Sequence, residues 1–376
     1  MKSPKVKTRG SAVENGIHKP PALDSRRATL DTSSALEPRP WSLDPFAFAL
    51  RRWTLDYLRA WDRFWFTAVE PHTLALIRIC AGAMLFYTHL IWALDLQSFL
   101  GPHSWVSSEL IRAINRDSFA RSYLWYVESP TLLVLLHAVA LTVFAMLTLG
   151  LFTRVTSIIA AFITISYCHR LAGSLFGLDQ INAMLALYLA VGPCGAVYSL
   201  DQWLAYRRGG DSQPLVSKFV SANIAVRLIQ IHMCVIYLFG GIGKMRGEMW
   251  WDGSALWYAI ANYEYQSLNV MWLVRFPWLV ALLTHLTVFW ETFYAFLIWP
   301  RHTRPVMLLM AVFVHGGIAV FLGMPTFGIA MLIGNLAFLS PATARAMMRV
   351  PFWLRPNGAH PEAGFAQKVN SQSRSN

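Results

Sequence analysis

Charged side chains are scarce in this sequence. They make up 14% of its 376 residues, whereas soluble domains carry about a quarter. Hydrophobic residues reach 55%, and the mean hydropathy is +0.41. The chain also lacks a His-Glu-x-x-His zinc motif, a phosphate-binding glycine loop and a Gly-x-Ser-x-Gly nucleophile elbow, which excludes the enzyme classes that those motifs define. The composition therefore predicts an integral membrane protein.

Cysteine is also sparse, and so are apolar residues near the N-terminus. The 4 cysteines form no Cys-x-x-Cys pair and no zinc-ligand spacing, so we interpret them as small core residues and expect no metal. The first 40 residues are rich in Lys, Arg, Ser and Pro, without an apolar run. This pattern excludes a signal peptide there and predicts a disordered cytoplasmic tail over residues 1–44.

The positive charge is unevenly distributed. A net charge of +12 would suit a nucleic-acid ligand, but most Lys and Arg residues lie in the tails and in alternate loops between apolar segments. Membrane insertion produces this distribution, with the basic loops on the cytoplasmic side. We therefore expect no nucleic-acid partner. The protein is predicted to lie in the cell membrane with both termini in the cytoplasm.

The spacing of apolar residues predicts an all-α polytopic helix bundle. Residues 45–70 carry apolar side chains at three- and four-residue intervals, which is typical of an amphipathic helix in the membrane interface. Residues 71–345 form the transmembrane domain, and 346–376 form a short cytoplasmic tail. About eight spans are long enough to cross the lipid bilayer, so membrane lipids are expected partners. These spans are 73–94, 131–152, 155–172, 180–198, 223–243, 279–299, 305–323 and 326–343.

Two long loops, 95–130 and 244–278, fall on the outer side in this topology. Both are rich in Trp, Tyr and Phe. One interpretation is an aromatic belt at the membrane surface. The other is a lid over a pocket that opens outward.

A lysine follows directly on the fifth apolar span. Gln230, Tyr237 and Lys244 are seven residues apart, so on a helix they form one polar stripe about 21 Å long. A lysine held near the apolar layer without a carboxylate is disfavoured as an ammonium ion. Lys244 is therefore predicted to be either a base or a membrane anchor, and Gln230 and Tyr237 either line its pocket or bond neighbouring helices.

Placing other polar residues inside the spans costs free energy, so each of them indicates a structural or functional role. Glu291 needs a partner, and Arg227 is the expected cation for a buried ion pair, with a proton-handling role as the alternative. His285 and His315 are interpreted either as satisfied core histidines or as a general base or a contact to a quinone oxygen.

One stretch combines these features with a specific pattern. In residues 237–258 a Tyr-containing apolar helix is followed by Gly-Gly-Ile-Gly-Lys, a Trp pair and Asp-Gly. Supporting pieces are Arg-Ile-Cys-Ala-Gly at 78–82, Tyr-Ser-Leu-Asp at 198–201, Glu291, the basic residues of 301–304, His315 and Phe-Gly-Ile at 327–329. Over about residues 70–345 the chain resembles the HTTM (horizontally transferred transmembrane) family, whose best-known members are the vitamin K-dependent gamma-glutamyl carboxylases.

The resemblance implies a chemistry for several positions. In the carboxylases the lysine at the place of Lys244 deprotonates a reduced naphthoquinone, and oxygenation and carboxylation follow at the lumenal face. Asp179 stands where the carboxylases have an active-site histidine. Catalytic roles are thus implied for Lys244, Asp179, Glu291 and His315, and quinol contacts for Gln230, Tyr237, Trp250, Trp251, Asp252 and His285.

The leading hypothesis is a membrane enzyme that acts on a quinol at the outer face. The alternative is a non-catalytic factor that binds a lipid, a quinone or a peptide, or that matures an exported peptide with a protein partner. A small-solute transporter is the third hypothesis, although no internal repeat of the kind many transporters show is evident.

Overall fold

The computed structural model describes residues 44–209 and 216–348. The predicted tails at 1–44 and 346–376 lie almost entirely outside these residues. The all-α prediction is confirmed, because the described residues form helices and no sheet. The one strand-like contact among them is an isolated bridge between Val69 and Phe219.

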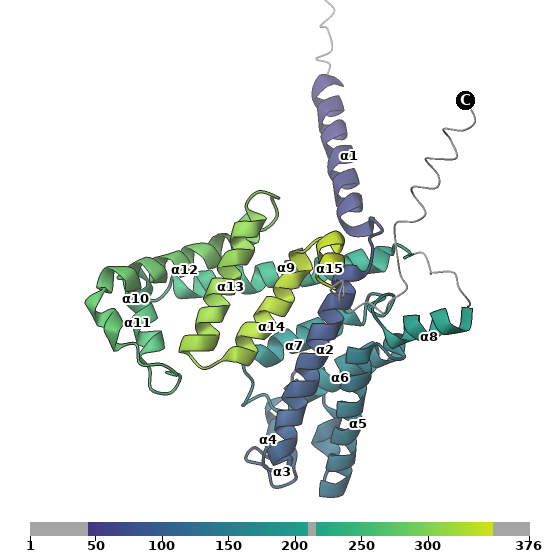
Figure 1. Cartoon of the computed structure of the whole chain (residues 1–376), viewed down its shortest axis with the longest axis vertical. Helices are drawn as coiled ribbons and strands as arrows, with labels where there is room; N and C mark the ends of the chain where they lie inside the picture. The colour runs from purple at the N-terminus through teal and green to yellow at the C-terminus, as the bar shows by residue number, and fades with distance from the viewer. Residues whose placement is uncertain (1–43, 210–215, 349–376) are drawn as a thin grey trace, which may run out of the picture. The chain divides into compact units, whose positions relative to one another are not determined.

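Helices follow one another along the whole described chain (Figure 1). In order they are α1 (Asp44–Phe66), α2 (His72–Trp92), η1 (Ala93–Asp95), α3 (Leu96–Leu100), α4 (Ser108–Ile114), η2 (Tyr123–Tyr126), α5 (Pro130–Leu149), α6 (Thr153–Arg170), α7 (Gly177–Leu189), α8 (Leu200–Gly209), α9 (Val220–Lys244), α10 (Glu248–Trp251), α11 (Ala255–Ile260), η3 (Met271–Arg275), α12 (Pro277–Leu297), α13 (Arg304–Phe321), α14 (Pro325–Asn335), η4 (Leu336–Phe338) and α15 (Pro341–Met347).

Contacts divide the chain into two compact units, residues 1–56 and 57–376. The predicted amphipathic segment is helical as α1, whose Trp53 and Trp61 side chains are exposed. Exposed aromatic residues suit a helix at a membrane surface, and that location stays a prediction. Everything described below lies in the second unit.

Helix ends follow local sequence rules, as α5 illustrates. The Ser129 hydroxyl accepts a hydrogen bond from the Leu132 backbone N–H, and Pro130 occupies the first helical position. Both are favourable at a helix start. At the other end Gly150 has a φ of 75°, a left-handed conformation that glycine adopts without a steric cost. The apolar run between these signals is therefore bounded on both sides by its own sequence.

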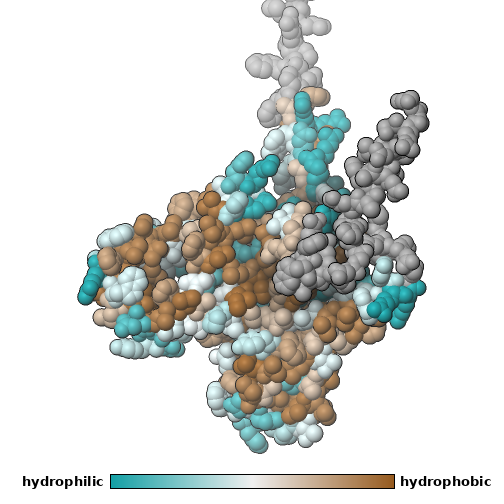
Figure 2. All heavy atoms as spheres, in the orientation of Figure 1, coloured by the Kyte–Doolittle hydropathy of each residue, from teal (hydrophilic) through white to brown (hydrophobic). Residues whose placement is uncertain are grey.

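Among the described residues, five helical segments are long and apolar enough to cross a membrane: His72–Leu100, Pro130–Leu149, Val220–Lys244, Pro277–Leu297 and Arg304–Phe321. Large apolar side chains on these helices point outward. Phe239, Phe296 and Phe313 are all more than 60% exposed, and hydrophobic residues cover much of the visible face (Figure 2). Apolar surface of this extent is typical of contact with lipid or another protein, not with water.

The predicted count of eight spans is not confirmed. The segments predicted at 155–172, 180–198 and 326–343 are helical in large part, as α6, α7 and α14, but they do not reach the length and apolarity of the other five. Helix α7 has 13 residues and α14 has 11, against the roughly 20 that a straight crossing needs. Helix α6 is long enough but carries many Thr and Ser residues.

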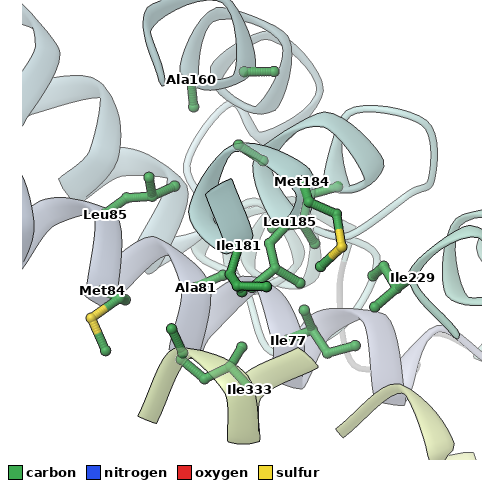
Figure 3. Packing of buried hydrophobic residues seen from close by; sticks show 14 of the residues in the cluster. Ile77, Ala81, Met84, Leu85, Ala160, Ile181, Met184, Leu185, Ile229 and Ile333 are labelled. Atoms are coloured by element: carbon green, nitrogen blue, oxygen red, sulfur yellow. The ribbon is translucent and has the colours of Figure 1, made fainter. Parts of the chain in front are cut away.

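The core is built mainly around α2 and α7. Ile77, Ala81 and Leu85 of α2 pack against Ile181 and Leu185 of α7, with side chains of α6, α9 and α14 around them (Figure 3). These α2 and α7 residues are at most 5% exposed. The two helices therefore hold the first spans and the last ones in one cluster.

A buried arginine ties α2 to the chain before α8. The Arg78 guanidinium donates hydrogen bonds to the carbonyl oxygens of Cys194, at 3.2 Å, and Tyr198, at 2.5 Å. The nearby Asp201 carboxylate accepts the backbone N–H groups of Phe152 and Thr153, both at 2.7 Å, at the start of α6. Burial alone would raise the pKa of Asp201, but these bonds outweigh it and hold that pKa below its ordinary value.

Helices α9 and α12 lie side by side (Figure 1). They touch at Gly241, where a Cβ atom would come within 2.7 Å of the Thr292 backbone nitrogen and 2.9 Å of its Cα. Small residues allow membrane helices to approach in this way. At Gly243, two residues on, a Cβ atom would meet nothing within 4 Å.

We expect Gly241→Ala to lower the melting temperature of the detergent-solubilised protein, because the added methyl group meets backbone that cannot move aside. Overpacking of this kind costs about 1–3 kcal/mol. The matched control is Gly243→Ala, which removes a helix-destabilising glycine without a clash and should leave stability unchanged or raise it by up to about 1 kcal/mol. Equal melting temperatures for the two variants would contradict the close packing.

Candidate functional site

Lys244 is the last residue of α9 and forms an ion pair. Its Nζ atom lies 2.5 Å from Oε2 of Glu291 in α12. The side chains are 27% and 11% exposed, so the pair lies at the edge of the packed helices. The condition under which the sequence favoured a base, a lysine without a nearby carboxylate, is therefore not met, because this lysine contacts a carboxylate directly.

The expected pairing of Glu291 with Arg227 is wrong. Arg227 lies 17 residues before Lys244, about 25 Å away along α9, and its ring contacts include Trp299, beyond the end of α12. The two helices thus run antiparallel, which brings Glu291 to Lys244 and leaves Arg227 at the far end. There Arg227 donates to Gln230 Oε1 at 2.9 Å.

Gly240 and Gly243 form a glycine face of α9 beside the ion pair. A Cβ atom at Gly240 would lie 3.2 Å from Glu291 Oε2 and 3.9 Å from Lys244 Nζ, so the ion pair itself occupies the space at this position. At Gly243 a Cβ atom would meet nothing within 4 Å. The ring of Trp250 lies 5.5 Å from Lys244 Nζ, within the range of a cation–π contact. Open space thus remains at Gly243, one residue before Lys244, and an indole ring lies beside the ammonium group.

A second polar cluster lies two helical turns deeper, at Tyr237. Its hydroxyl lies 2.7 Å from His315 Nε2 and 2.8 Å from Asn335 Nδ2. Asn335 in turn accepts a hydrogen bond from the Tyr294 hydroxyl at 2.5 Å. The Tyr237 ring packs against Trp290 and Tyr294. Side chains from α9, α12, α13 and α14 thus share one buried network.

One arrangement of protons satisfies these contacts. The Asn335 amide donates to the Tyr237 oxygen, and the Tyr237 hydroxyl donates to His315 Nε2. In that tautomer His315 carries its own proton on Nδ1. This nitrogen is buried and has no hydrogen-bond partner among the described residues. A buried donor without a partner is costly, and such groups often face a ligand.

The ion pair and the network are neighbours in the structure. The ring of Trp290, the residue before Glu291, packs against the rings of both Tyr237 and His315. Lys244, Glu291, Tyr237 and His315, which the sequence singled out separately, therefore belong to one region of the structure.

Two residues of this network, Asn335 and Tyr294, were not predicted. Asn335 lies inside an apolar segment, and a buried amide there is the same kind of signal as a buried charge. A search that included amides as well as ionisable groups would have found it. Tyr294 could not be found in this way, because tyrosine is common in apolar helices and its role depends on a partner from another helix.

Two predicted site residues have contacts of their own. Gln230 donates to the carbonyl oxygen of Ala337 at 2.7 Å and lies near Arg227, far along α9 from Lys244. The Asp179 carboxylate accepts the Phe176 backbone N–H at 2.9 Å and closes the first turn of α7. These hydrogen bonds to backbone groups give both side chains a structural role.

The predicted rim residues surround the end of α9. Trp251 Nε1 donates to the Met245 carbonyl at 2.7 Å, and His285 Nε2 lies 3.1 Å from the Trp251 carbonyl oxygen. Asp252 accepts hydrogen bonds from the hydroxyl and backbone N–H of Ser254, which lower the pKa of its carboxyl. Together with Trp250 these residues close the chain back onto α12. Among the residues described, no group of three or more His, Cys, Asp and Glu could hold a metal ion.

The ion pair can be tested by a double-mutant cycle. Lys244→Met and Glu291→Leu should each destabilise the protein in detergent, because each leaves its partner unpaired. The loss is about 3–5 kcal/mol for a fully buried pair, and the partial exposure of Lys244 places it at the lower end. The double variant should recover most of that loss in melting temperature. Strictly additive losses would show that the two groups do not interact.

Comparisons with known proteins give one partial match. Over 133 residues the chain is 29% identical to an uncharacterised protein, YitO of Bacillus subtilis (strain 168). The match covers 32% of this chain and 41% of that protein. No protein-family model matches the chain, and no solved structure does. The chain is thus similar to YitO over part of its length, and this similarity indicates no activity.

Proposed function

We propose that this protein is a multi-pass membrane enzyme that binds a reduced quinone beside Lys244 and Glu291 and removes a proton from its hydroxyl group. The observation that carries the proposal is an ion pair at the apolar α9–α12 helix pair, behind a glycine face. Ionisable groups in such positions are costly and usually functional. The resemblance to the carboxylases, where the corresponding lysine is the quinol base, supports the same role here.

The residues present suit a flat ligand with polar oxygens. Gly243 leaves open space one residue before Lys244, and Trp250 offers an aromatic face beside the lysine. Deeper in the protein, His315 Nδ1 is a buried polar atom without a partner among the described residues. A reduced quinone supplies an acidic hydroxyl group and, with dioxygen, is converted to an epoxide and water.

The ion pair changes how Lys244 can act. An ammonium group cannot accept a proton, so the first acceptor is the Glu291 carboxylate, 2.5 Å from Nζ. When the proton moves from Lys244 to Glu291, the neutral amine can take the proton of a bound hydroxyl group. The net result is a protonated Glu291 and an ammonium ion at Lys244 that stabilises negative charge on the bound oxygen.

A specific observation supports the alternative, a non-catalytic factor that binds a quinone, a lipid or an exported peptide. The Glu291 carboxylate already satisfies Lys244, so the pair can hold helices α9 and α12 together and orient a bound group without proton transfer. In that case the same residues form a binding site, and the distinction has to be made by chemistry.

Quinone chemistry in purified membranes distinguishes the two. With reduced naphthoquinone and oxygen, the wild-type protein should form epoxide, and Lys244→Ala should lower the rate at least about 100-fold, the usual contribution of a general base. Arg246→Ala, which removes an exposed cation of the same loop, is the control and should keep the activity. If the wild-type protein binds the quinone but forms no epoxide, the binding factor is the better description. Solute flux in sealed vesicles that requires Glu291 would indicate a transporter instead.

We further propose that the site faces the outside of the cell and that both termini are cytoplasmic, with α6, α7 and α14 completing eight crossings. The distribution of Lys and Arg over the loops supports this orientation. Helix α12 separates the loop after Lys244 from the short turn before α13, so these two loops must lie on opposite sides if α12 crosses the membrane.

Cysteine labelling in intact cells tests the orientation. Tyr263, which is 96% exposed, lies in the loop after α9, and a Tyr263→Cys variant should react with an impermeant maleimide. The matched His302→Cys variant, in the turn before α13, should react only after the membrane is permeabilised. The wild-type chain serves as the blank for the four native cysteines. The opposite labelling pattern would reverse the orientation.

A further inference from the structure

We propose that a groove between α8 and the end of α5 binds an anionic phospholipid. The groove has a volume of about 660 Å³ and is lined mainly by Leu149, Tyr198, Leu200, Trp203, Tyr206 and Val216. Ligand sites in proteins commonly fall between about 300 and 1,000 Å³. The inference is independent of the site at Lys244.

The apolar side of the groove is formed by one face of α8. Leu200, Trp203 and Tyr206 follow at intervals of three residues, so they lie along the same side of the helix. Each of them is between 36% and 48% exposed. This partly exposed apolar face suits an acyl chain.

The far end of α8 is basic. Arg207 and Arg208 occupy its last turn, and the Arg207 guanidinium lies 4.4 Å above the Trp203 ring. Figure 2 shows hydrophilic residues at this end, next to hydrophobic ones. An arginine that stacks on an aromatic ring keeps its donors free for a phosphate group. A site for an acyl chain and a site for a phosphate group thus lie next to each other on one short helix.

Within α8 no acidic group lies beside the two arginines. The sole acidic residue of this helix is Asp201, and its carboxylate is bound to the backbone N–H groups at the start of α6. It lies at the opposite end of the helix from Arg207, so the helix itself does not neutralise its basic end.

The position of the groove favours a lipid over a soluble ligand. Leu149 is the last residue of α5, one of the five helices that could cross a membrane. Lipid headgroups lie at the ends of such helices, where Trp and Tyr are enriched and basic residues attract anionic lipids. The acyl chain of a phospholipid would contact the apolar face of α8, and its headgroup would contact the basic end of that helix.

The test measures binding of fluorescent short-chain phosphatidylglycerol to the detergent-solubilised full chain, with phosphatidylcholine as the uncharged comparison. The wild-type protein should prefer phosphatidylglycerol about thirty-fold, the expected effect of two arginines. Arg207→Gln/Arg208→Gln should reduce the preference to about twofold or less. Trp203→Ala should weaken binding of both lipids by similar factors, because it removes contacts to the chain.

Matched variants separate the site from general effects of charge or folding. Arg207→Lys/Arg208→Lys keeps the charge and should retain most of the preference, as should Arg301→Gln, which removes an exposed arginine elsewhere. A preference that survives in the double glutamine variant, or that is absent from the wild-type protein, would overturn the proposal. So would full competition by free glycerol phosphate, because the groove would then contribute nothing.

Discussion

The close contact of α9 with α12 is the constraint on which the candidate site depends. Gly241 brings the α9 backbone against Thr292, and this register places Lys244 opposite Glu291 one turn later. A larger residue at 241 would separate both groups. The open space at Gly243 lies in the same run of small residues, two positions after the glycine that makes the close contact. Packing and chemistry therefore share one short run of small residues.

The same register organises the deeper cluster. Tyr237, two turns before Lys244, meets His315 and Asn335 from the last helices of the domain. Its hydrogen bonds leave a single polar atom of His315 without a partner among the described residues. Trp290 joins the two levels, because it precedes Glu291 and its ring packs against the rings of Tyr237 and His315.

Elsewhere in the second unit, a buried arginine also joins segments that are distant in sequence. Arg78 and Asp201 join α2, the start of α6 and the chain around α8 through backbone carbonyl and N–H groups. Asp201 stands in the first turn of α8, and Arg207 and Arg208 occupy its last turn. The proposed lipid groove thus adjoins a structural hydrogen-bond network, as the proposed quinone site adjoins a close helix contact.

The sequence alone determined the all-α class and the longest apolar spans, and it singled out Lys244, Glu291, Tyr237 and His315 as polar residues next to or within apolar segments, because apolar length and isolated polar residues are local properties. It could not determine that Glu291 contacts Lys244 instead of Arg227, since that choice depends on the antiparallel register of α9 and α12. It also missed Asn335, and its count of eight spans stays a prediction, because α7 and α14 are apolar but short. Partners between helices distant in sequence are decided by packing, and only the tertiary structure contains that information.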